Sequence, residues 1–128
     1  MSLHIASLYI APSELHHRGV YTAADLAADN LIEICPVIVL EAEDRQLIHR
    51  SVLHDYYFSW GEDDKGAAIA LGYGSLYNHS YQPNARYLVD FEMETISIYS
   101  IKDIAAGEEI KINYNGLPDD QSPLWFIK

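Results

Sequence analysis

Short apolar segments alternate with polar turns along the whole chain. Residues 3–10 (LHIASLYI) and 31–40 (LIEICPVIVL) are apolar and rich in β-branched side chains, which favours buried strands. Pro36 interrupts the second segment and predicts an edge position, a bulge or two shorter strands. Residues 23–30 (AADLAADN) fit either a helical turn or a loop, and residues 41–53 are the best helix candidate after residue 40.

The second half of the chain continues the same alternation, and its strands are equally short. The predicted elements are an aromatic strand at 54–60, an acidic turn at 62–66, and strands at 67–72, 85–91, 95–101 and 108–114. The strands at 85–91 and 95–101 are close enough in sequence to form a hairpin. Six or more short strands at this spacing predict a mostly β fold with a few short helices, built as a sandwich or a barrel-like clip.

Length and composition indicate one folded domain over residues 1–128. Apolar residues make up 49% of the chain and charged residues 21%, which is typical of globular proteins. No apolar run approaches the roughly 20 residues that cross a bilayer, so we expect no membrane association. The N-terminus has no signal-peptide pattern, which predicts a cytoplasmic or otherwise intracellular protein.

The net charge of −11 bears on the choice of partner. An acidic surface repels the phosphates of nucleic acids, so we expect no direct binding of DNA or RNA. The same surface favours a basic partner such as a lysine-rich peptide tail. Many soluble cytoplasmic proteins are acidic, however, so the charge alone does not decide the function.

Local patterns give little sign of a metal or of a familiar catalytic motif. His16 and His17 are adjacent, and His49 and His54 are five residues apart, which are poor spacings for metal ligands. No HExxH, paired CxxC or GxSxG motif occurs, and the single cysteine excludes an internal disulfide and a cysteine-cluster zinc site. Gly72-Tyr73-Gly74 holds only two glycines of a dinucleotide fingerprint and precedes no helix. We therefore expect no metal.

Two features remain as candidates for a site. Residues 76–84 (LYNHSYQPN) place two polar turns back to back between apolar segments. Tyr114 ends the last predicted strand just before Asn115-Gly116, where its hydroxyl could face a site. Periodicity alone also suits a tyrosine ring packed in the core, and it favours that interpretation.

Three stretches together point to a family. NHSYQPN at 78–84, AAGEEIKINYNG at 105–116 and HRGVYTAADLAADNLIEICPV at 17–37 resemble, in order and spacing, the signature of SET-domain protein lysine methyltransferases. The resemblance spans about residues 15–116 and leaves an aromatic tail at 117–128. It implies a SET-type β-clip of several small sheets with a C-terminal pseudoknot.

The resemblance also implies an activity and a cofactor. A methyl group would pass from S-adenosylmethionine to a lysine ε-amine of a protein substrate, leaving S-adenosylhomocysteine. The backbone at Arg18 and Gly19, the Asn78 amide and the His79 backbone would hold the cofactor. Tyr114 would stand at the reacting centre and position both groups for transfer.

Further roles follow from the same resemblance. Tyr87 and Cys35 would line the channel for the substrate lysine, although many members have a tyrosine where Cys35 stands. Trp125 or Phe126 would cover the adenine, or would simply dock the tail. His17 replaces the leading glycine of the first motif, which could narrow the approach of the cofactor or simply place the imidazole outward.

Three points stay open at this stage. No cysteine-rich segment follows residue 116, so the site would be covered by the aromatic tail, by a second subunit of a homodimer, or by nothing. A non-catalytic SET-like module that binds a basic peptide or protein partner is an alternative to the enzyme. A small β-clip domain that binds a carbohydrate or other small ligand through its tyrosines is a second alternative.

Overall fold

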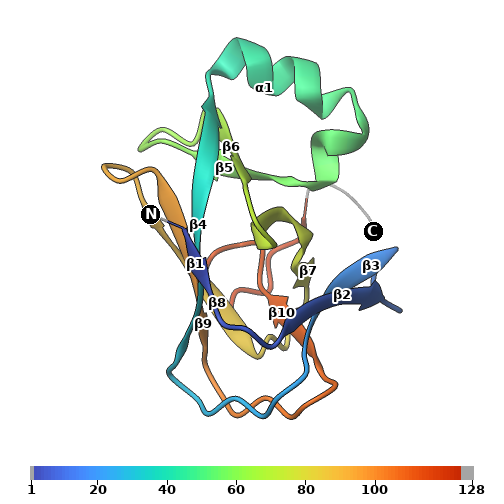
Figure 1. The fold of residues 1–128 in the computed structure, drawn as a ribbon. Coiled ribbons are helices and arrows are strands. Elements are labelled where there is room, and N and C mark those ends of the chain that lie inside the picture. The colour runs from blue at the N-terminus through green and yellow to red at the C-terminus, as the bar shows by residue number, and fades with distance from the viewer. Residues whose placement is uncertain (1, 125–128) are drawn as a thin grey trace.

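Ten strands, all but one of them short, dominate the computed structural model, which describes residues 2–124. Figure 1 shows them as two sheets, with the α-helix lying at one end of the molecule. The elements are β1 (Leu3–His4), β2 (Leu8–Pro12), β3 (Arg18–Thr22), β4 (Leu31–Leu40), α1 (Ala42–His49), the 3-10 turn η1 (Val52–Asp55), β5 (Tyr57–Trp60), β6 (Gly66–Ala70), the 3-10 turn η2 (Gly74–Leu76), β7 (Asn78–His79), β8 (Ala85–Asp90), β9 (Thr95–Ser100) and β10 (Glu109–Ile112). The prediction of a mostly β fold is therefore confirmed.

The larger sheet is organised around the long strand β4. Its strand order is β5-β6-β4-β9-β8, with β1 also paired to β4. The first part of β4 pairs with β9, with Cys35 opposite Ile96, and the last part pairs with β6. Pro36 sits where β4 changes partner, and the strand continues through it, with the Val37 N–H donating to the Glu94 carbonyl (3.1 Å). The irregular register lies instead between Leu31 and Glu33.

The smaller sheet brings the three signature segments together. Its order is β2-β3-β10-β7. β10 runs antiparallel to β3, with Ile110 opposite Val20, and parallel to β7, with Ile112 opposite His79. A strand near the C-terminus thus lies between two strands formed much earlier in the chain. This is the strand arrangement that the predicted pseudoknot requires.

The helical prediction for residues 41–53 is largely correct, but the α-helix ends at His49, before the predicted end. α1 is followed by η1, so residues 54–55 belong to a 3-10 turn and the aromatic strand begins at Tyr57. No residue of α1 is buried. Arg45 nevertheless ties the helix to the β5–β6 hairpin, because its guanidinium lies over the Tyr57 ring and donates to the Gly66 carbonyl (2.9 Å).

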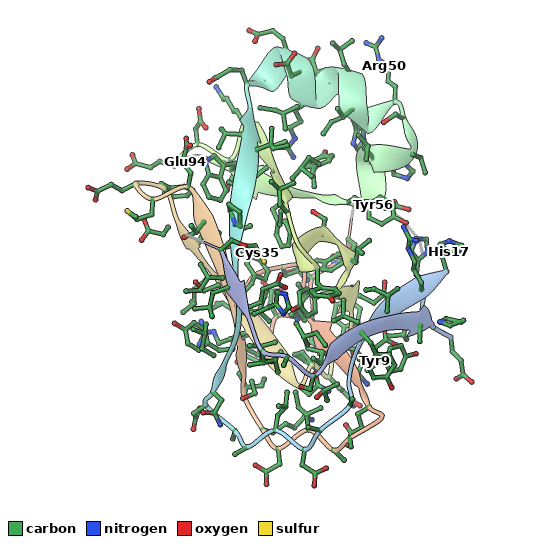
Figure 2. The ribbon with its side chains drawn as sticks, in the orientation of Figure 1. Tyr9, His17, Cys35, Arg50, Tyr56 and Glu94 are labelled. Atoms are coloured by element: carbon green, nitrogen blue, oxygen red, sulfur yellow. The ribbon has the colours of Figure 1, made fainter. Side chains whose placement is uncertain are left out.

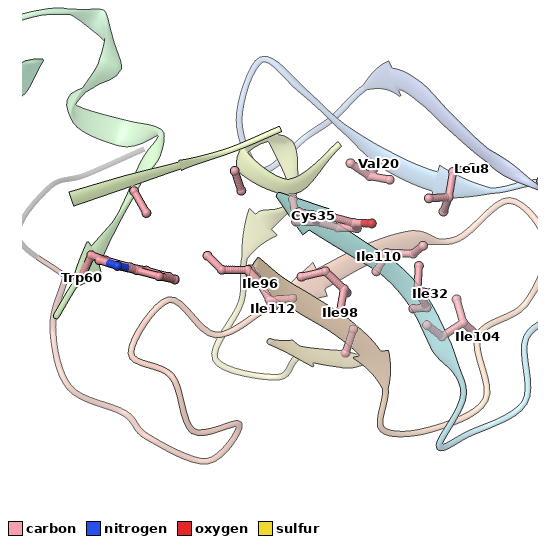
Figure 3. Packing of buried hydrophobic residues seen from close by; sticks show 14 residues of the cluster. Leu8, Val20, Ile32, Cys35, Trp60, Ile96, Ile98, Ile104, Ile110 and Ile112 are labelled. Carbon is pink, nitrogen blue, oxygen red and sulfur yellow. The ribbon is translucent and has the colours of Figure 1, made fainter. Parts of the chain in front are cut away.

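Aliphatic side chains from both sheets form one core, seen close by in Figure 3. Ile96, Ile98, Ile110 and Ile112 are fully buried. Burial of each such side chain is worth roughly 1.5–3 kcal/mol. The core joins β9 to β10, and it therefore fixes the smaller sheet, with its signature segments, against the larger one.

Candidate functional site

The buried side chain of Asn78 in β7 holds the turn after β2 (residues 13–17) and the first residue of β3 in place. The Asn78 amide nitrogen donates to the Arg18 carbonyl (3.0 Å) and to the Glu109 carboxylate (2.8 Å). The other oxygen of Glu109 accepts from the Ser13 hydroxyl (2.7 Å). A side chain at Gly19 would collide with the Glu109 carboxylate and crowd the Asn78 amide. A larger residue at position 19 would therefore have to displace the Glu109 carboxylate and the Asn78 amide from each other.

His17 carries a strained backbone in the same turn. Its φ of 32° lies in the left-handed region, where a side chain is disfavoured and glycine is not. Figure 2 shows His17 at the end of the β2–β3 hairpin. A glycine at this position, which the resemblance implies, would adopt the conformation without strain.

We expect His17→Gly to stabilise the protein by about 1 kcal/mol, since it removes the left-handed strain at some cost in chain entropy. Thermal unfolding measures the gain, and calorimetric titration with the predicted cofactor should show tighter binding. Glu94→Gly is the matched control, because Glu94 has a φ of 53° in the β8–β9 turn and is not among the residues that line the cavity. Equal effects of both variants on cofactor affinity would contradict a role of His17 in narrowing the approach.

Tyr114 follows β10 and is held at both ends. Its hydroxyl donates to the Tyr77 carbonyl (2.6 Å), and its backbone N–H donates to Nδ1 of His79 (3.0 Å). His79 Nδ1 is therefore an acceptor and carries no proton. Burial, with a smaller contribution from the Asp55 carboxylate, raises the pKa of the Tyr114 hydroxyl well above its ordinary value. The hydroxyl is a neutral donor at any pH at which the protein works.

A cavity of about 660 Å³ opens beside Tyr114, between β5 and β8. The Tyr87 hydroxyl donates to the Tyr114 carbonyl (3.1 Å), and its ring packs edge-on against Phe58 at 5.0 Å between centroids. Burial, and to a lesser extent Asp64, raises the pKa of Tyr87 to about 12. The residues that line the cavity include Asp55, Tyr56, Tyr77, Tyr87 and Tyr114. Tyrosine rings and one carboxylate suit an extended apolar stem that ends in an amine.

Three residues whose contacts the sequence did not reveal connect the turn after β2 to this cavity: His16, Asp55 and Tyr56. His16 Nε2 lies 3.4 Å from the Tyr56 hydroxyl and 3.8 Å from the Asp55 carboxylate. On its other side Asp55 lies 2.8 Å from His54 Nε2, close enough for an ion pair if the histidine is protonated. The local signal was the His-Asp-Tyr run at residues 54–56, but its contact with His16 depends on the tertiary fold.

Cys35 does not lie at the cavity. It is fully buried in the core, as Figure 2 also suggests from its place inside the molecule, and it is not among the residues that line the cavity. Its sulfur lies close to Gly74, where an added Cβ would come within 2.8 Å of it. The structure therefore brings Arg18, Gly19, Asn78, His79, Tyr87 and Tyr114 together and leaves Cys35 outside. Trp125 and Phe126 lie beyond the described residues.

Within residues 2–124 no three or more histidine, cysteine, aspartate or glutamate side chains gather in a way that could hold a metal ion. None of the helices in that range is both long and apolar enough to span a bilayer.

Comparisons with known proteins agree with this geometry. The SET domain family matches residues 17–115. A Schizosaccharomyces pombe histone-lysine N-methyltransferase specific for lysine 37 of H3 is 34% identical over 120 residues, which cover 93% of this chain and 76% of that protein. A Plasmodium falciparum structure assigned as a histone methyltransferase is 29% identical, with a TM-score of 0.64 over 84% of this chain and 96% of that one.

A more distant structure shares the fold alone. A humanized mutant of the Chaetomium thermophilum Polycomb Repressive Complex 2 is 19% identical, with a TM-score of 0.69 over 87% of this chain and 15% of that one. The family match covers most of the chain, and the fission yeast relative exceeds 30% identity over nearly all of it. The chain belongs to the SET-domain family of protein-lysine methyltransferases.

Proposed function

We propose that this protein-lysine methyltransferase uses S-adenosylmethionine to methylate a lysine in a basic, histone-like tail, and that transfer takes place in the cavity, beside Tyr114. The observation that carries the proposal is the position of Tyr114. Tyr114 lines the cavity, while its backbone N–H donates to His79 in the cofactor signature. One residue thus contacts both halves of the proposed site.

The residues at the turn after β2 fit the amino-acid end of S-adenosylmethionine. The carbonyl oxygens of His16 and Arg18 lie 3.4 and 3.0 Å from the Asn78 amide nitrogen, so they converge on one point and could accept from an ammonium group. The Arg18 side chain is exposed, and within residues 2–124 its guanidinium makes no hydrogen bond or ion pair, which leaves it available to a carboxylate. We assign Arg18, Gly19 and Asn78 to this end of the cofactor and the His79 backbone to the adenine.

The cavity residues would prepare the substrate amine. Bound S-adenosylmethionine supplies the methyl group and a positive sulfonium. A lysine ammonium has a reference pKa near 10.4 and must lose its proton before it can attack. The Asp55 carboxylate at the cavity wall would attract the ammonium, while the surrounding tyrosine rings would favour its neutral form. Tyr114 and Tyr87, which both stay protonated, would orient the amine and would not act as the base.

The basic character of the substrate is supported by the charge of the whole chain and by the relatives. The net charge is −11, one relative is a histone-lysine N-methyltransferase, and a second is assigned as a histone methyltransferase. The cavity lining itself carries Asp55 and Asp64 but also Arg45 and Arg86. A preference for a basic tail would therefore come from the surface around the cavity, outside the lysine channel.

A homodimer and a cytoplasmic location remain predictions. Leu47 and Val52, on α1 and η1, are 63% and 76% exposed, and an apolar surface of this kind would suit a second copy. A histone-like substrate would instead place the protein wherever that substrate is found. Sedimentation of the purified protein and fluorescence imaging of a tagged form would address the two questions.

The test of the proposed function is incubation with methyl-labelled S-adenosylmethionine and either core histones or cell lysate, followed by mass spectrometry for methyl-lysine. We expect label on lysine, and excess S-adenosylhomocysteine should suppress it. Calorimetric binding of S-adenosylmethionine without any methyl-lysine would favour the non-catalytic module. Absence of binding heat at millimolar cofactor would favour the domain that binds another small ligand.

A further inference from the structure

Glu33, near the start of β4, is a buried carboxylate that none of the roles above uses. It is 2% exposed, and within residues 2–124 no lysine, arginine or histidine forms an ion pair with it. A buried charge is costly unless hydrogen bonds replace the lost water. The groups that donate to Glu33 therefore identify what the carboxylate holds in place.

The Gly72-Tyr73-Gly74 turn is shaped to receive this carboxylate. The Tyr73 N–H donates to Oε2 of Glu33 (3.0 Å). Gly72 has a φ of 66°, and a side chain there would collide with the same oxygen. Position 72 thus requires glycine for its conformation and for the space that Glu33 occupies. The two glycines that suggested an incomplete dinucleotide motif have a different use in this fold.

The second oxygen of Glu33 accepts from the Tyr77 hydroxyl (2.7 Å). Tyr77 is only 1% exposed, so no water competes for that hydrogen bond. The carbonyl of the same residue accepts from the Tyr114 hydroxyl (2.6 Å). Glu33 therefore fixes Tyr77 through its side-chain hydroxyl, and the Tyr77 backbone carbonyl contacts Tyr114 at the proposed reacting centre.

We propose that Glu33 is a positioning residue for methyl transfer, because its hydrogen bonds to Tyr73 and Tyr77 fix the backbone of residues 73–78 and thereby the Tyr77 carbonyl that orients the Tyr114 hydroxyl. The inference rests on the proposed role of Tyr114. It assigns a use to a buried acid 44 residues before Tyr77 in sequence. Small displacements of a group at a reacting centre can lower turnover by as much as a hundredfold without weakening binding.

The test is the steady-state kinetics of Tyr77→Phe, Glu33→Gln and the double variant, each assayed well below its melting temperature. Tyr77→Phe keeps the ring and removes the donor, and we expect kcat to fall by about tenfold while KM for the lysine substrate and Kd for S-adenosylmethionine stay within about twofold. Glu33→Gln can keep one of the two hydrogen bonds of residue 33, so its kcat should fall by less than that of Tyr77→Phe. The double variant should lose no more than Tyr77→Phe, since both changes break the same link.

Tyr21→Phe is the matched control, because its hydroxyl also donates to a backbone carbonyl, that of Pro12 (2.7 Å), but lies away from the cavity. Its kcat should equal that of the wild type. Unchanged kcat in Tyr77→Phe together with a lower melting temperature would overturn the proposal and leave Glu33 a structural role alone.

A second measurement does not depend on turnover and so separates this inference from the proposed function. In a sample labelled at tyrosine, the NMR resonances of the Tyr114 ring should shift in Tyr77→Phe and Glu33→Gln and stay in place in Tyr21→Phe. Unshifted resonances in both variants would overturn the inference even if the wild type is fully active. A wild type that transfers no methyl group would instead count against the proposed function.

Discussion

Tyr114→Phe should lose most methyl transfer, by about a hundredfold or more in kcat, while its affinity for S-adenosylmethionine stays nearly unchanged. The change removes only the hydroxyl that meets the Tyr77 carbonyl. The backbone N–H of residue 114 would still donate to His79, so the cofactor side of the site would stay in place. Single-turnover transfer to a lysine peptide and calorimetric titration with the cofactor measure the two quantities separately.

Tyr81→Phe is the matched control for this prediction. The Tyr81 hydroxyl donates to the Ser122 carbonyl (2.9 Å), and its ring packs edge-on against His79, but it is not among the residues that line the cavity. Its loss should leave turnover within about twofold of the wild type, as surface substitutions commonly do. Full activity in Tyr114→Phe would remove Tyr114 from the reacting centre. A parallel loss of cofactor affinity would assign it to binding.

Asn78→Ala should weaken S-adenosylmethionine binding by about tenfold or more, a loss of one to two hydrogen bonds to charged or carbonyl groups. The amide joins the turn after β2 to Glu109, and without it the Arg18 carbonyl and the Glu109 carboxylate each lose a donor. The partly buried Glu109 carboxylate would then lack one of its two side-chain donors, so we also expect a loss of stability of about 1 kcal/mol. Calorimetry and denaturant unfolding measure the two effects.

Asn84→Ala provides a matched comparison within the same signature. Asn84 is also 2% exposed, and its side chain bonds to the backbone of β10 at Glu109 and Lys111 (both 2.8 Å). We expect a similar loss of stability and little change in cofactor affinity when the protein is assayed far below its melting temperature. Equal losses of affinity in the two variants would mean that Asn78 acts only through the fold.

The strand pattern was predictable because it depends on local sequence. The β8–β9 hairpin appears at Ala85–Asp90 and Thr95–Ser100, within a residue of the predicted ends, and β10 follows a Gly107 with a φ of 89°, as a tight turn requires. The full length of β4 was harder to predict, since Pro36 suggested a break in the strand. Its missing N–H is tolerated because the strand exchanges one partner for another at that point.

Placing individual site residues depended on information that local sequence does not hold. Tyr87 was expected at the channel and does line the cavity, but Cys35, expected there too, is enclosed between β9 and the η2 turn. A resemblance in sequence does not show in which direction a side chain points. His16 and Asp55 escaped notice because their contact joins residues 39 apart, and only the fold brings such pairs together.

The position of β10 has a consequence for how the protein acquires its activity. Val20 and Ile110 are register partners, so the central pairing of the smaller sheet closes a loop of about 90 residues. Contacts of such long range are formed late and slow the folding of small β proteins. During synthesis, β3 and β7 leave the ribosome before β10, and without β10 they cannot form the proposed cofactor site. Competence for the cofactor should therefore arise in one step, with global folding, and a chain that stalls before residue 109 should neither bind it nor transfer a methyl group.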